Sequence, residues 1–179
     1  MPVVSRVVAG TSGSPGSLVA LRYAEFLALA HDAVLVPVLA WEPPGNHRLP
    51  AGEPLMRIWR QAASERMRAA LVAVWGQVPA DPRVQPLVER GLPGLVLVSI
   101  ACQPGDVLVV GAGRRGALRR AASCAVSRYC AARACCPVVL VPPPDLAREV
   151  RHGPIARELR RRAVTPARIT GAHHGPAAG

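Results

Sequence analysis

Residues 107–141 read VLVVGAGRRGALRRAASCAVSRYCAARACCPVVLV, and this stretch decides the fold. It begins with an apolar run that ends in glycines, continues through arginines and small residues, and closes on a second apolar run, VVLV. Both apolar runs are continuous rather than alternating, which is typical of strands covered on both faces. The stretch therefore predicts a strand, a loop, a helix over 117–134 and a last strand over 138–141.

The same pattern of strand and helix recurs upstream. Strands are expected over 3–9, 33–41 and 83–90, and helices over 17–30, 55–75 and 95–102. In the first helix, Leu18, Leu21, Ala24, Leu27 and Ala28 share one face. The face expected to be buried in the long helix consists of Leu55, Ile58, Ala62, Met67, Leu71 and Val74. The segment 83–90 alternates and holds a proline, which predicts a partly exposed strand.

Repeated units of this kind predict an α/β fold over residues 3–141. The expected architecture is a five-stranded, parallel, doubly wound sheet of the flavodoxin or Rossmann type, with strand order 3-2-1-4-5 and helices on both faces. Ligands of such sheets bind at the carboxyl ends of the strands, near the switch point. We expect one domain over residues 1–144, followed by an arginine-rich tail over 145–179 that is helical in part or disordered.

The composition limits the chemistry. The chain has 179 residues and a net charge of +11, and all 22 of its basic residues are arginine. Without lysine, a Walker-type phosphate site and a Schiff base are both excluded. The strong positive charge favours anionic partners without choosing among them.

No apolar run reaches the roughly 18 residues needed to span a bilayer. Five cysteines without a disulfide spacing point to a reducing compartment, so we expect a cytoplasmic protein.

The loops after Ala9, Leu39 and Val110 would face the ligand edge of this sheet. The loop after Val110 precedes a helix and carries Arg114, Arg115, Arg119 and Arg120, so it could hold a phosphate or be a solvated loop; spacing alone leaves the two interpretations equal. The loop 10–17 is rich in glycine and hydroxyl residues, but its spacing is not GxGxxG. It is equally well explained as a tight turn whose hydroxyls cap the next helix.

Catalytic residues are harder to nominate. The two loops hold no carboxylate, Glu42 is the one acid at the end of the second strand, and the histidines fall on a helix end, a loop and the tail. No acid–base or nucleophilic arrangement follows. Cys124, Cys130, Cys135 and Cys136 lack CxxC spacing, which argues against zinc; most of them are expected to be small apolar residues on the buried face of the last helix. We predict no enzyme and no metal.

Three segments together resemble the universal stress protein family. They are RVVAGTSGSPGSLVALRYA (6–24), VLVPVLAWEPP (34–44) and the block VLVVGAGRRGALRRAASCAVSRYCAARACCPVVLVPPP (107–144). The resemblance spans about residues 3–143, and the opening GTSGSPGS and the GAGRRGALRR block look like single-domain actinobacterial members. It implies a non-catalytic stress-response or regulatory protein that forms a homodimer through its last strand, Val138–Val141.

The resemblance also places a site for an adenine nucleotide such as ATP. ATP-binding members are marked by G-x2-G-x9-G-[ST] and by an aspartate after the first strand. Here Gly111 keeps the first glycine, Arg114 replaces the second, Cys124-Ala125 replace the final pair, and Ser12 stands at the aspartate position. The residues that the resemblance assigns to the nucleotide are Gly10, Ser12, Ala40, Val110, Gly111, Arg114, Gly116, Ala125, Val126 and Ser127. A side chain at Arg114 obstructs the close approach that glycine allows, so the expected binding is weak or altered.

Two alternatives from other classes stay open at this point. The first is a module that binds anions or nucleic acid through the arginine-rich loop and tail; the tryptophans do not lie near these arginines, as stacking on bases would require. The second is an ATPase or nucleotidyl-transferase on the same sheet. The missing lysine, acid and metal ligands make this the weakest of the three hypotheses.

Overall fold

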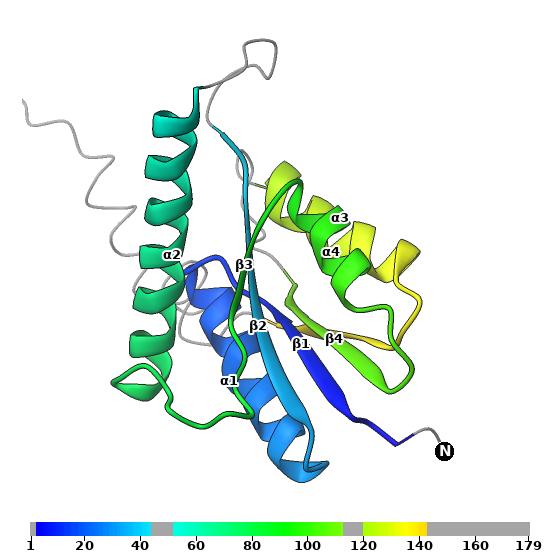
Figure 1. The fold of residues 1–179 in the computed structure, drawn as a ribbon. Coiled ribbons are helices and arrows are strands. Elements are labelled where there is room, and N and C mark those ends of the chain that lie inside the picture. Colours follow the sequence, from blue (N-terminus) through cyan, green and yellow to red (C-terminus); the bar gives the residue numbers. More distant parts are fainter. Residues whose placement is uncertain (1–2, 44–51, 113–119, 143–179) are drawn as a thin grey trace, which may run out of the picture. The chain divides into compact units, whose positions relative to one another are not determined.

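The computed structural model of the chain describes residues 3–43, 52–112 and 120–142, with side chains of the last segment described from residue 125 onward. The predicted tail over 145–179 lies outside these residues. Strands and helices alternate along the described chain (Figure 1). The strands are β1 Arg6–Gly10, β2 Val34–Trp41, β3 Leu87–Arg90, β4 Asp106–Gly111 and β5 Val138–Val141. The helices are α1 Pro15–Ala30, α2 Glu53–Trp75, α3 Pro93–Ile100 and α4 Arg120–Arg133.

The strands form one parallel sheet with the order β3-β2-β1-β4-β5. β1 lies at its centre and pairs with both β2 and β4, so that Ala9 is opposite Pro37 on one side and Val109 on the other. This confirms the predicted doubly wound sheet and its strand order. β3 and β5 are the two edge strands of the described sheet.

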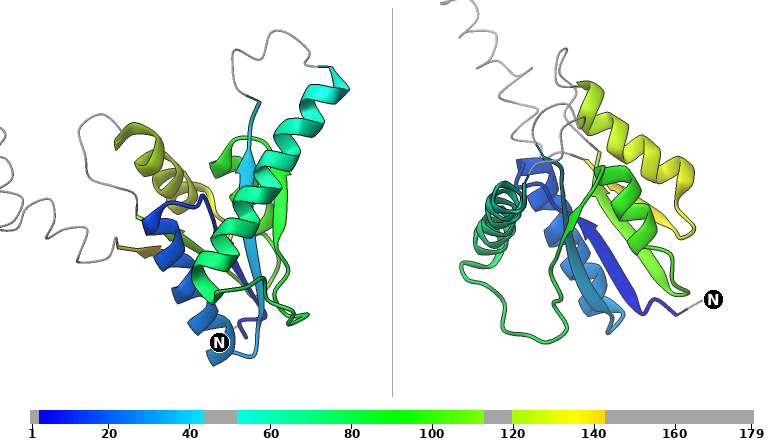
Figure 2. Two further views of the ribbon diagram at one scale, coloured as in Figure 1. Left: turned by 90° about the vertical axis from the view of Figure 1, so that its left-hand side faces the viewer. Right: turned by 45° about the horizontal axis from the view of Figure 1, so that its top comes forward.

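Each face of the sheet carries its own apolar core. One core joins α1 and α2 to inward side chains that include Val7, Leu39 and Val109. The other joins α3 and α4 to Val8, Val38, Leu108 and their neighbours. Successive strand residues therefore alternate between the two cores, and both faces are apolar, because each is covered by helices. Figure 2 shows the two pairs of helices on opposite sides of the sheet.

Two predictions of detail were wrong. The first concerns the inward face of α2, where Leu55 and Ile58 are 43% and 61% exposed and Ala62 is exposed as well. The buried residues of this helix are Ala63, Met67, Ala70 and Leu71, with Met56 and Trp59 packed against the same core. In the first half of the helix the inward-facing residues are thus Met56, Trp59 and Ala63, one position after the predicted Leu55, Ile58 and Ala62. Both sets are apolar and have helical spacing.

The second concerns the third strand, which is shorter than the predicted 83–90. Its ladder with β2 begins at the pair Val38–Leu87, and only an isolated bridge, Leu35–Val84, precedes it. Pro37 and Pro86 lie between the bridge and the ladder on the two facing segments. Proline has no N–H to donate, which accounts for the interruption.

Candidate functional site

The edge at which β1 and β4 end is the switch point of the sheet. From the end of β1 the chain enters α1 on one face, whereas the helix that follows β4, α4, covers the opposite face. Gly10 and Val110 are neighbours there, since a Cβ added to Gly10 would lie 3.0 Å from Val110 Cγ1. Ala40 in β2 contributes to the α3/α4 core, as Val110 does. The candidate residues on β1, β2 and β4 therefore share one edge of the sheet.

In the loop between β1 and α1, the serine hydroxyl groups form hydrogen bonds within the loop itself. Ser14 is the N-cap of α1, and its Oγ accepts from the Ser17 N–H at 3.3 Å. Ser17 Oγ in turn accepts from the Ser12 N–H at 3.2 Å and donates to the Ser14 carbonyl at 2.9 Å. Ser12 Oγ lies 3.0 Å from Ser14 Oγ. The loop is thus a capped turn, as its alternative interpretation held, and its exposed Ser12 supplies a hydroxyl where ATP binders carry a carboxylate.

Gly111 at the end of β4 is required by packing. A Cβ at this position would meet the backbone of α1, at 2.9 Å from the Gly16 carbonyl oxygen and 3.1 Å from its carbon. Neither atom belongs to a side chain that could rotate away. Glycine at this position therefore lets the first turn of α1 lie directly against β4.

The remaining candidates lie on α4 or in the preceding loop. Ser127 is buried, Val126 is partly buried against the α3/α4 core, and Ala125 is exposed. Arg114 and Gly116 lie outside the described residues, as does the side chain of Cys124. The described part of the site therefore consists of the ends of β1, β2 and β4, the capped loop and the visible part of α4.

The predicted role of the cysteines holds only in part. Cys130 is fully buried on α4, as expected for an apolar core residue, and burial raises the pKa of its thiol to about 11. Cys136 is partly buried beyond the end of the helix, where desolvation also raises its pKa. Cys135 is exposed, so for this residue the prediction was wrong, and Cys102, to which the prediction did not apply, is exposed as well. Among the described residues, no three acidic, histidine or cysteine side chains gather as metal ligands.

A bidentate ion pair with a buried carboxylate lies at the opposite, amino-terminal edge of the sheet. Arg6 at the start of β1 binds both carboxylate oxygens of Asp106 at the start of β4, each at 2.9 Å, and donates to the Ile100 carbonyl at 2.7 Å. The Asp106 side chain is fully buried and also accepts from the Gln103 N–H at 2.9 Å. The sequence carried one signal for this pair, a charged residue at the start of each of two apolar strands.

The sheet, its helices and its switch point place the chain in a structural class. A parallel sheet with two helices on each face is the architecture of doubly wound α/β proteins, whose ligands bind at the carboxyl edge near the switch point. Among the described helices, none is both long and apolar enough to cross a membrane.

The comparisons identify the family within this class. The sequence model of the universal stress protein family matches residues 4–142, so the chain belongs to that family. A search of curated protein sequences gave no significant match.

Solved structures agree on the fold. Universal stress protein UspA from Lactobacillus plantarum is 22% identical, with a TM-score of 0.61, over 77% of this chain and 97% of that one. A universal stress protein solved in complex with cAMP is also 22% identical, with a TM-score of 0.53, over 79% and 99% of the two chains. The universal stress protein from Archaeoglobus fulgidus is 18% identical, with a TM-score of 0.53, over 77% and 98%.

Proposed function

We propose that the chain is a non-catalytic stress-response or regulatory protein that binds an adenine nucleotide, weakly or in an altered manner, at the carboxyl ends of β1 and β4. The observation that carries the proposal is the switch point itself. Gly10 and Val110 meet there on adjacent strands, and the chain leaves the sheet toward opposite faces. A switch point of this kind is where doubly wound sheets bind nucleotides. One protein of similar fold was solved with cAMP.

Three residue choices argue that binding differs from that of ATP-binding members. Ser12 offers a hydroxyl, already 3.0 Å from Ser14 Oγ, in place of a carboxylate. Ala125 has no hydroxyl to offer a phosphate, and Arg114 replaces a glycine. The arginines after β4 supply charge instead of close backbone approach, and guanidinium groups bind phosphate oxygens through charge-assisted hydrogen bonds.

Calorimetric titration with ATP, ADP and cAMP tests the proposal. We expect saturable heat from at least one of them at high protein concentration, with an affinity that falls as salt is added, since the contacts are ionic. Arg114→Ala should weaken this binding. Arg133→Ala, at the exposed end of α4, is the matched control and should leave it unchanged. Absence of heat with all three nucleotides would overturn the proposal.

The proposal also includes the absence of catalysis. We expect no release of phosphate from ATP above the rate in buffer. Release that is abolished by Ser127→Ala would instead make the chain an ATPase. Native mass spectrometry of the purified protein adds an independent measurement, because it reports a co-purified nucleotide and the number of subunits together.

The same proposal includes a homodimer formed through β5. In the described sheet this strand pairs with β4 alone, which leaves one row of its backbone groups without a strand partner, and Leu140 is 45% exposed. An unprotected edge of this kind favours pairing with a second copy. Leu140→Arg should therefore give a monomer in light scattering, through repulsion between two positively charged chains. Leu87→Arg on the other edge strand, where Leu87 is 38% exposed, should leave the dimer intact. A dimer that survives Leu140→Arg would exclude this interface.

A further inference from the structure

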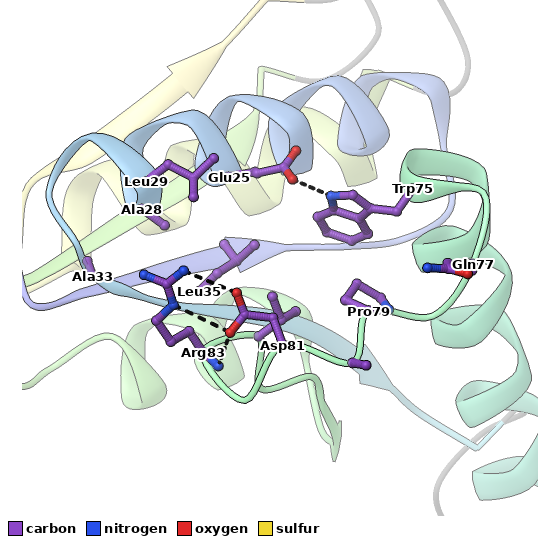
Figure 3. Close-up of a pocket in the computed structure, with 12 residues that line it drawn as sticks. Glu25, Ala28, Leu29, Ala33, Leu35, Trp75, Gln77, Pro79, Asp81 and Arg83 are labelled. Carbon is purple, nitrogen blue, oxygen red and sulfur yellow. Dashed lines mark hydrogen bonds and ion pairs between the residues drawn. The ribbon is translucent and has the colours of Figure 1, made fainter.

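A pocket of about 330 Å³ lies at the amino-terminal edge of the sheet, opposite the proposed nucleotide site (Figure 3). Its lining comes from the end of α1, the start of β2 and the segment that joins α2 to β3. A volume of roughly 300 Å³ is at the lower end of the range for small-molecule sites. Nothing in the proposed function uses this pocket.

The body of the pocket is apolar and has one aromatic wall. Leu35 forms part of its floor, Leu29 and Pro79 flank it, and the indole of Trp75 closes one side (Figure 3). The indole is held in place because its Nε1 donates a hydrogen bond to the Glu25 carboxylate on α1. A flat or compact apolar group therefore has a fixed surface on which to lie.

The polar groups around this body are mainly acidic. Arg83 Nη1 donates to Asp32 Oδ1 at 2.9 Å, and Arg83 Nη2 donates to Asp81 Oδ2 at 3.2 Å. One guanidinium is thus shared by two carboxylates, and Glu25 adds a third. The Arg83 N–H groups, that of the backbone first, lower the pKa of Asp81, so this carboxylate is ionised at neutral pH. Arg22 does not line the pocket, and its Nη2 donates to the Val74 carbonyl at 3.4 Å.

The helix dipoles add to this negative potential. α1 ends at Ala30 and α2 ends at Trp75, and residues at both ends line the pocket. Neither helix has a basic residue in its last turn. A helix C-terminus is equivalent to roughly half a negative charge. The pocket is therefore negative although the chain as a whole carries +11.

We propose that this pocket binds a small organic cation, an ammonium group attached to an aromatic or compact apolar body. The body would lie between Trp75, Leu29 and Pro79, and the ammonium would lie against the Glu25 carboxylate beside the indole. An ammonium near the indole face gains a cation–π attraction in addition to its ionic contacts. The segment before β3 is held against β2 by two backbone hydrogen bonds, from the Leu35 N–H to the Arg83 carbonyl and from the Gln85 N–H to the Leu35 carbonyl, each at 2.8 Å, so this side of the site is preorganised.

The probe for this proposal is 2-phenylethylamine, with 2-phenylethanol and 3-phenylpropanoate as its neutral and anionic counterparts. Calorimetry on the full chain should show saturable binding of the amine, at least about fivefold tighter than either counterpart, as expected for an added charge contact near a protein surface. Equal or tighter binding of the alcohol or the acid, or no saturable binding of the amine, would overturn the proposal.

Glu25→Gln locates the charge contact, because the amide oxygen can still accept from Trp75 Nε1 while the negative charge is lost. It should weaken amine binding about three- to tenfold and leave the alcohol unchanged. Glu65→Gln is the matched control, since Glu65 is an exposed acid on α2 outside the pocket lining. Gln77→Lys, which adds a positive charge to the exposed pocket rim, is the second variant and should also weaken amine binding. If both variants fold and bind the amine as the wild type does, the pocket is not the site.

Discussion

Replacing Gly111 by alanine gives the most direct test of why this glycine is present. The added Cβ would lie 2.9 Å from the Gly16 carbonyl oxygen and 3.1 Å from its carbon. Both are backbone atoms in the first turn of α1, so relief requires that this turn move by a few tenths of an ångström away from β4. Overpacking of this kind costs about 1–3 kcal/mol. Because no rotamer change relieves it, we expect about 2 kcal/mol less free energy of unfolding.

Alanine substitutions at two other glycines provide a comparison for this change in unfolding free energy. At Gly10 an added Cβ would lie 3.0 Å from Leu97 Cδ1 and from Val110 Cγ1, which are ends of side chains that can rotate, so Gly10→Ala should cost only about 1 kcal/mol. At Gly16 a Cβ would meet nothing within 4 Å. Gly16→Ala should therefore stabilise the protein by about 0.5 kcal/mol, through the higher helix propensity of alanine.

The assay is urea unfolding followed by circular dichroism, performed on the three variants and the wild type without ligand, together with calorimetric titration of ATP. The expected order of stability is Gly16→Ala, wild type, Gly10→Ala and Gly111→Ala. If Gly111→Ala unfolds within about 0.5 kcal/mol of the wild type and only loses nucleotide binding, the packing explanation is refuted. The glycine would then be present for the ligand alone.

Four further predictions concern the scaffold. Asp106→Asn leaves the Arg6 guanidinium without its carboxylate and should cost about 3 kcal/mol of unfolding free energy in urea; a loss below about 1 kcal/mol would mean that the buried pair is dispensable. The pKa of Cys130 is raised from 9.0 to about 11, so the folded state favours the protonated thiol, and stability should fall by about 2 kcal/mol as the pH rises from 9 to 11; a Cys130→Ala variant with the same pH profile would contradict this. At pH 8 a maleimide should label Cys135 in the native protein and Cys130 only after unfolding, as mass spectrometry of peptides would report. Ser14→Ala removes the acceptor for the Ser17 N–H and should cost about 1 kcal/mol in thermal unfolding, whereas Ser14→Asp should retain most of the stability.

The positions of β1, β2 and β4 can be predicted from the sequence because both faces of these strands are buried, and the order of the strands follows from the doubly wound class that repeated strand–helix units favour. Continuous apolar runs such as VLVV and VVLV, which are separated by a helix-forming segment, are typical of strands in a parallel sheet that is covered by helices. The inward face of α2 is less determined, because the stripe Leu55–Ile58–Ala62 and the stripe Met56–Trp59–Ala63 are one residue apart and both are apolar. Contact with the sheet decides between them, and a single helix does not contain that information.

The carboxyl edge of the sheet can be predicted from the sequence, whereas the pocket at the amino-terminal edge cannot. The carboxyl edge follows from topology, since loops after consecutive parallel strands must meet there. The amino-terminal pocket does not, because its fixed groups are far apart in the chain. Trp75 and Glu25 are 50 residues apart, and Arg83 and Asp32 are 51 residues apart. No periodicity or motif relates such pairs, so they become visible only when the helices and the segment before β3 are assembled.

The direction of the chain explains why these edges should attract ligands of opposite charge. In a parallel α/β sheet, the helices begin at the carboxyl edge and end at the amino edge, so their dipoles make the first edge positive and the second negative. The sequence reinforces both signs. The loops after β1 and β4 contain no acidic residue, and the second contains Arg114, Arg115 and Arg119, whereas Glu25, Asp32 and Asp81 gather at the other edge. The proposed nucleotide site at one edge and the proposed organic-cation site at the other would therefore both follow from one dipolar arrangement. Added salt should weaken both, while Arg114→Ala should affect only the first and Glu25→Gln only the second. A variant that altered both affinities equally would show that the two sites are not independent.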